Sequence, residues 1–269
     1  MPLRKPHLPV PTFSRQQIAL ADLCARELWH GVSYQTGKKL YMGDEEFLVS
    51  FANPAKALIQ NPASALHFTE VDIRALIRTA TLRAMFRSTL STDFQAGFAA
   101  FAPVVLPYYQ AFITNPSSAD SYKYATDATL DWCQTFVQSS QTNVVNGNYR
   151  VPLANRILFF ALPDMKIFIY SNGLGKKMQY QTRPQAALPS YNRELDAGYK
   201  SNFSRLSNLR LPSAVSMGDN LWTSINQSDW WQRRVFDLAL MIHFGATQVT
   251  QSLRQRARQI IQSQTAVVI

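Results

Sequence analysis

The chain has 269 residues, of which 46% are hydrophobic and 16% are charged, and this composition is typical of a globular protein. It carries 27 Lys and Arg against 17 Asp and Glu, and the net charge of +10 favours a polyanionic partner such as nucleic acid. No apolar run approaches the roughly 18 residues of a membrane span. The proline-broken N-terminus has no apolar signal core, so a cytoplasmic protein is expected.

The first third of the chain predicts an arm followed by helices. Residues 1–13 are expected to form an extended basic arm over the surface. Ser14 is placed to cap a helix that runs through Leu28, with Gly31 as its stop. The acidic run 44–46 opens a short helix that Pro54 should end. A capping-box pattern at Thr69 then opens a longer helix.

The middle of the chain predicts more helices with proline breaks. Pro103 and Pro107 should interrupt an apolar segment, and residues 119–137 read as a helix. The polar stretch 138–148 is a predicted turn or linker. Residues 149–161 have a helical apolar pattern, residues 167–170 form a strand-like run, and residues 171–177 read as a glycine-containing turn.

The last third predicts a loop over 179–190, a helix over 191–209 and an irregular stretch over 211–221. Ser228 should cap a helix over 230–244 that Gly245 stops, and a final helix should span about 247–263. The sequence therefore predicts an all-α fold of about ten to twelve helices. Cys24 and Cys133 are expected to be free buried thiols.

The basic segment 149–183 is the strongest candidate for contact with nucleic acid. It holds six bases against one acid, Asp164, and aromatic residues lie between the bases. Bases bind phosphates, glycines let the backbone approach them, and exposed rings stack on nucleobases. Phe159 and Phe160 are expected in the core, and Tyr149, Tyr170 and Tyr180 in a pocket. The predicted DNA-binding residues are Arg150, Arg156, Tyr170, Gly173, Gly175, Lys176, Lys177 and Arg183.

Three short motifs resemble the helix-hairpin-helix DNA glycosylase superfamily, most closely divergent bacterial proteins of the 8-oxoguanine glycosylase fold. They are VPLANRILFF at 151–160, the Pro163-Asp164 corner, and Ile169-Tyr170-Ser171. The stretch WWQRRVFDLAL at 230–240 resembles the closing helix of the same proteins. The resemblance covers residues 149–178 and 229–244, which make up about a sixth of the chain.

The resemblance implies that residues 1–269 form a single glycosylase-like unit of two packed lobes. Residues 139–183 would contain the hairpin and the DNA-contacting segment, and double-stranded DNA would be the partner. A base would be flipped into a pocket between the lobes. A carboxylate would stabilise the positive charge that develops on the sugar as the glycosidic bond breaks.

The sequence departs from that family at its catalytic positions. The family's aspartate falls on Ser171, and its lysine would fall near Asn155 or Arg156. Three explanations stay open. Another acid replaces the aspartate, or Asn172 or Asn155 positions a water molecule, or the protein binds DNA without cleaving it. The available acids are Asp164, Glu194, Asp196 and Asp237.

The function expected on this resemblance is that of a monofunctional DNA N-glycosylase that excises a damaged or modified base. Defence against phages with modified bases is one setting for such an enzyme. A non-catalytic DNA-binding helical protein is the alternative, and a basic helical protein that binds another protein is the third reading. Other catalytic signatures are absent from the sequence, including a Walker loop, a GxSxG elbow and HExxH. No metal or organic cofactor is indicated, because His7, His30, His67 and His243 show no zinc-ligand spacing.

Overall fold

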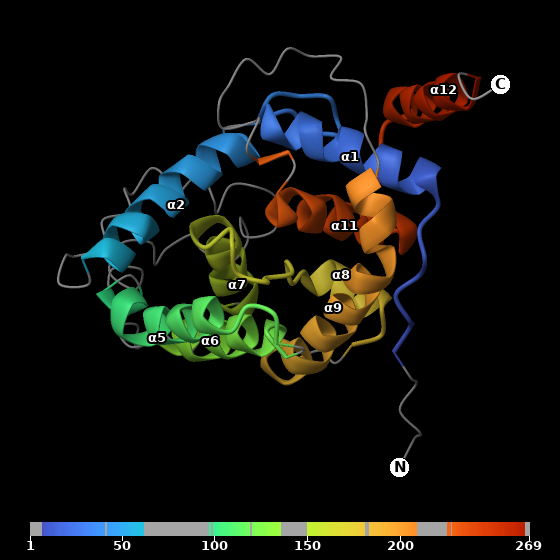
Figure 1. The fold of residues 1–269 in the computed structure, drawn as a ribbon. Helices are drawn as coiled ribbons and strands as arrows, with labels where there is room; N and C mark the ends of the chain where they lie inside the picture. Colours follow the sequence, from blue (N-terminus) through green and yellow to red (C-terminus); the bar gives the residue numbers. More distant parts are fainter. Residues whose placement is uncertain are drawn as a thin grey trace, which may run out of the picture. The chain divides into compact units, whose positions relative to one another are not determined.

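The computed structural model describes residues 7–40, 42–61, 97, 99–118, 120–135, 150–180, 183–208, 225–226 and 228–266. Nine α-helices lie within these ranges (Figure 1). The described residues form no β-strand, and their one β-bridge is an isolated pairing of Val32 with Lys39. The prediction of an all-α fold is therefore confirmed for the part of the chain that the structure describes.

The helices are numbered as in Figure 1. They are α1 Arg15–Trp29, α2 Asp44–Gln60, α5 Phe101–Thr114, α6 Tyr122–Thr135, α7 Arg150–Ala161, α8 Asn172–Lys177, α9 Pro184–Asn208, α11 Asp229–His243 and α12 Gln251–Ala266.

The contacts between residues divide the chain into two compact units. Unit 1 comprises residues 1–40, 177–179 and 194–269, and unit 2 comprises residues 41–176 and 180–193. Helix α9 contributes its first ten residues to unit 2 and the remainder to unit 1.

In unit 1, α1 packs against α11 and α12. Ser14 and Gln17 form a capping box at the start of α1, and the left-handed backbone of Gly31 (φ 69°) follows its end, as predicted. The ring of Trp29 meets Trp230 and Trp231 of α11 edge-on. The indole N–H of Trp231 donates to Oδ1 of the buried Asp22 over 3.0 Å, which fixes α1 to α11.

The described part of the N-terminal arm also belongs to unit 1, and it forms no helix. The backbone N–H of Phe13 donates to Oδ1 of Asn202 in α9 (2.8 Å), and Nδ2 of Asn202 donates to the carbonyl of Pro11 (3.1 Å). Val10 lies directly against Gly198 of α9. Phe13 is fully buried. The arm therefore ends in the core rather than on the surface alone, because its apolar residues pack against α9.

In unit 2, α7 packs against α2 and α6, and α5 lies beside α6 (Figure 1). Phe160 of α7 contacts Phe47 of α2, with ring centroids 5.6 Å apart. Phe101 of α5 meets Trp132 of α6 edge-on at 5.2 Å. Phe159 and Phe160 are both buried, which confirms their predicted place in the core. Both cysteines are free and buried, also as predicted.

The predicted breaks at Pro54 and Pro107 were wrong, whereas near Pro103 a turn at Ala100 separates the helical residues Gly97 and Ala99 from α5. Helix α2 continues for six residues beyond Pro54, and α5 contains Pro107 in its interior. Pro103 lies in the first turn of α5, where a missing N–H loses no helical hydrogen bond. The buried residues on either side, including Phe51 and Leu58 in α2, offset the local cost of an interior proline.

Four other predicted elements also differ from the structure. The predicted loop 179–190 contains the start of α9 at Pro184, since a proline suits the first helical position. The strand-like run 167–170 forms no strand, and the predicted turn at 171–177 contains helix α8. The final helix begins at Gln251. The elements predicted at Thr69, over 138–148 and over 211–221 lie outside the described residues.

The helix predicted after Ser228 is confirmed. The Ser228 hydroxyl accepts the N–H of Trp231 at the start of α11, and Gly245 follows the helix with a positive φ of 63°. The predicted helix over 119–137 is confirmed as α6 in its central part.

Candidate nucleic-acid interface

Helix α7 holds the following segment, residues 167–170, through one buried side chain. Oδ1 of Asn155 accepts a hydrogen bond from the backbone N–H of Tyr170 over 2.7 Å. Asn155 is fully buried, and its Nδ2 has no hydrogen-bond partner among the described residues. The Asn155 side chain satisfies the backbone N–H of Tyr170, a group that a neighbouring strand would satisfy in a sheet. The structure thus places Asn155 in a supporting position beneath the segment.

Three tyrosines surround the end of this segment. The ring of Tyr191, in α9, meets Tyr170 at 4.9 Å and Tyr180 at 5.2 Å, in both cases edge-on. The Tyr191 hydroxyl donates to the carbonyl of Ile169 over 3.0 Å. Tyr170 and Tyr180 are only 3% and 5% exposed, so their rings hold the segment in place and present no open face for stacking. Burial raises the pKa of Tyr170 to about 12. Tyr149 lies outside the described residues.

Ser171 and Asn172 begin helix α8. The Ser171 side-chain oxygen accepts the N–H of Leu174 over 3.4 Å, and its carbonyl accepts the N–H of Gly175 over 2.8 Å. These two bonds close the first turn of α8, which explains why the residues form a helix rather than the predicted turn. Asn172 is half-buried in the first position of α8. Ser171 therefore has a local structural role.

Gly175 permits the close packing of α8 on Tyr170. A Cβ atom at this position would lie 3.1 Å from the Tyr170 hydroxyl oxygen. Gly175 is itself buried, whereas Gly173 is exposed. The close approach thus serves the internal packing of unit 2, and only Gly173 offers its backbone to solvent.

The basic residues of the segment divide into exposed and covered groups. Lys176 and Lys177, the last two residues of α8, are exposed, and so is Arg183 just before α9. Arg156 is half-buried in α7. Arg150 is the first residue of α7. Lys166, like Arg156, is half-buried. Among the bases of residues 149–183 whose burial the structure describes, the exposed ones are therefore Lys176, Lys177 and Arg183.

The candidate acids lie in different environments. Asp164 is exposed in the turn after α7. Burial raises the pKa of the Tyr109 hydroxyl, and the charge of Asp164 and a hydrogen bond to it raise that pKa further. Glu194 is half-buried in α9.

Two other candidate acids, both in unit 1, are buried and ion-paired. Asp237 lies 3.3 Å from Nη1 of Arg234 within α11, and both side chains are 4% exposed. Asp196 lies 2.5 Å from Nζ of Lys200 within α9. Both acids thus have the surroundings of structural carboxylates.

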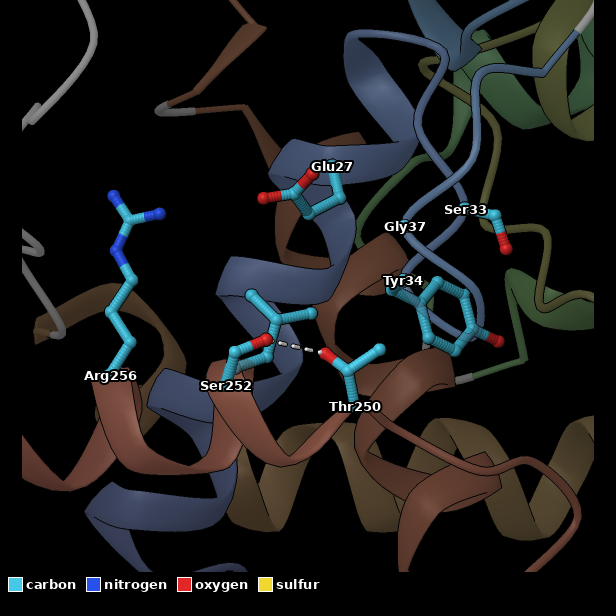
Figure 2. A pocket seen from close by; sticks show the side chains of 8 residues that line it. Glu27, Ser33, Tyr34, Gly37, Thr250, Ser252 and Arg256 are labelled. Carbon is cyan, nitrogen blue, oxygen red and sulfur yellow. Dashed lines mark hydrogen bonds between the residues drawn. The ribbon is translucent and has the colours of Figure 1, made fainter.

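Sequence reasoning did not anticipate a pocket in unit 1 with a volume of about 210 Å³. Figure 2 shows it between α1, the loop after α1 and α12. Glu27 and Arg256 line it together with the hydroxyl residues Ser33, Tyr34, Thr250 and Ser252. Oγ1 of Thr250 and Oγ of Ser252 lie 3.2 Å apart, and the Tyr34 hydroxyl is 3.0 Å from Thr247. No sequence signal pointed to it, because its residues come from segments more than 200 positions apart.

The described residues contain no group of three His, Cys, Asp or Glu side chains that could hold a metal ion. None of their helices has the length and apolar character to cross a membrane.

Comparison with protein-family models, with curated proteins and with solved structures finds no match.

Proposed function

We propose that this protein binds double-stranded DNA, with Lys176, Lys177 and Arg183 contacting the phosphate backbone. The observation that carries this proposal is the exposure of adjacent lysines at the end of α8, a helix anchored by buried contacts to Tyr170. Anchored cations lose less conformational entropy on binding than cations on a free loop. The net charge of +10 and the resemblance of residues 149–178 to DNA glycosylases support the same partner.

The test is the salt dependence of duplex binding. Each phosphate contact contributes about 0.9 to the slope of log affinity against log salt concentration. The double variant Lys176→Gln/Lys177→Gln should therefore lower that slope by about 1.8. Lys38→Gln/Lys39→Gln is the matched control, because it also removes two exposed adjacent lysines. Equal slopes for wild type and the α8 variant would refute the proposed contact.

Base excision is the second candidate function. The segment's likeness to a glycosylase favours it, and Asp164 is the exposed member of the acid set, whereas Asp196 and Asp237 are buried and ion-paired. In this proposal Asp164 stabilises the positive charge on the sugar as the N-glycosidic bond to a damaged or modified base breaks.

Alkali treatment separates binding from excision, since abasic sites break under alkali. Duplexes that carry damaged, methylated or glucosylated bases are incubated with the protein and then treated. Strand breaks at one base type, lost in Asp164→Asn with binding retained, would support excision by Asp164. Binding to every duplex with no breaks would leave a non-catalytic DNA-binding protein. No salt-dependent binding at all would overturn both functions and favour a protein partner.

A further inference from the structure

The exposed side of α12 forms a continuous polar surface without an acid. Its exposed described residues carry arginine, glutamine or serine, and residues 245–269 contain no Asp or Glu. They are Gln251, Ser252, Arg254, Gln255, Arg258, Gln259, Gln262 and Ser263. At 3.6 residues per turn these positions fall in one uninterrupted arc, which we call the α12 surface.

The opposite side of α12 fixes this orientation within unit 1. Leu253 and Ala257 are buried, and α12 packs there against α1. Arg256 is half-buried on that covered side, and it lines the same pocket as Glu27 (Figure 2). Arg256 therefore shares its surroundings with an acid, and Arg254 and Arg258 are exposed.

Arg254 and Arg258 are four positions apart, so their side chains are neighbours on the helix. Like charges at this spacing destabilise a helix slightly. α12 itself contains no acid. Two acids of α1, Glu27 and Asp22, lie close enough that their charges act on the same thiol, Cys24, as that of Arg254. A polyanion bound to the exposed side would add negative charge next to both arginines.

We propose that the α12 surface is a second DNA-contacting surface, in which Arg254 and Arg258 bind phosphates and the glutamines hydrogen-bond to the duplex. This inference rests on the proposed function, because it assumes that the partner is double-stranded DNA. Arginine and glutamine both donate hydrogen bonds to phosphates and to base edges. The major groove of B-DNA is wide enough to admit an α-helix with such side chains. The α12 surface and Lys177 belong to unit 1, whereas Lys176 and Arg183 belong to unit 2.

The experiment measures duplex affinity of the full-length protein at several salt concentrations. Arg254→Gln/Arg258→Gln removes two charges while keeping good helix formers, so α12 should still fold. We expect the slope of log affinity against log salt concentration to be smaller by about 1.8 in this variant than in wild type. Between 50 and 200 mM salt, the variant should therefore lose about tenfold less affinity than wild type. Circular dichroism and thermal unfolding that match the wild type establish that the helix is intact.

Arg256→Gln is the matched control on the same helix. It should leave the slope unchanged, whereas the single variant Arg258→Gln should lower it by about 0.9. A wild-type slope in the Arg254→Gln/Arg258→Gln variant would overturn the inference. The proposed function would survive that result if Lys176→Gln/Lys177→Gln still lowered the slope. A wild-type protein that binds no duplex would refute both.

Discussion

Asn155 and Tyr170 are joined by a buried hydrogen bond in which the side-chain oxygen of Asn155 accepts the backbone N–H of Tyr170 over 2.7 Å. This contact ties α7 to a segment that has no helix or strand of its own. It thereby sets the course of the chain into α8 and its exposed lysines.

Asn155→Ala should lower the free energy of unfolding by about 1–3 kcal/mol, because it leaves the buried N–H of Tyr170 without an acceptor. Urea unfolding followed by circular dichroism measures the change. Asn208→Ala, at an exposed position near the end of α9, is the control and should change stability by less than about 0.5 kcal/mol. Equal stabilities for the two variants would contradict this role of Asn155.

Gly175 and Tyr170 should be energetically coupled. The Cβ of Gly175→Ala would meet the Tyr170 hydroxyl oxygen at 3.1 Å, but the next ring atom only at 3.5 Å. Tyr170→Phe removes the nearest atom. Gly175→Ala should therefore be more favourable in the Tyr170→Phe background than in wild type, by about 1 kcal/mol. A double-mutant cycle by urea unfolding gives the coupling, and additive effects would show that the helix moves freely away from the ring.

Gly198 should be required for the N-terminal arm to pack against α9. A Cβ atom there would lie 2.3 Å from Cγ1 of Val10, which no small adjustment relieves. Gly198→Ala should displace the arm, lower stability by about 1–3 kcal/mol and speed proteolysis of residues 7–13. Val10→Gly removes the clashing atoms, so the pair Val10→Gly/Gly198→Ala should lose less than the sum of the single variants. If the losses of stability in the two single variants simply add in the double variant, Val10 does not pack against Gly198.

Asp237 should act as a structural acid. Asp237→Asn leaves the buried guanidinium of Arg234 without its carboxylate partner, and it should cost about 3–5 kcal/mol of stability. Asp164→Asn at the exposed turn should change stability by less than about 0.5 kcal/mol. If Asp237→Asn instead had wild-type stability and lost excision with binding retained, Asp237 would be the catalyst.

Alkaline pH should destabilise the fold through Tyr170. An unfolded tyrosine ionises near pH 10, whereas burial raises the pKa of Tyr170 to about 12 in the folded protein. The folded state thus holds this proton more tightly, and stability is present below pH 10 and is lost as pH rises from about 10 to about 12. The free energy of unfolding should therefore fall less between pH 10 and pH 12 in Tyr170→Phe than in wild type. Each unit of difference between the folded and unfolded pKa of Tyr170 corresponds to about 1.4 kcal/mol of this loss. Identical pH profiles would mean that Tyr170 ionises normally.

The local sequence determined the helices whose ends carry their own signals. Ser14 with Gln17 fixed the start of α1, and Ser228 fixed that of α11, because capping bonds join residues only three positions apart. Apolar spacing likewise placed Phe159 and Phe160 in the core, and composition alone established the positive charge.

Tertiary structure decided what depends on distant residues. Proline disfavours a helix locally, but α2 continues past Pro54 and α5 past Pro107, because buried residues on both sides of each proline pack in the core. Tyr170 became a buried support rather than a stacking ring because Tyr191 of α9 covers it. The apolar spacing of Leu253 and Ala257 marks the covered side of α12, but only the tertiary structure shows that α1 is the helix that covers it. Burial and pairing are properties of the assembled chain, so a residue's type could nominate it for a site but could not place it there.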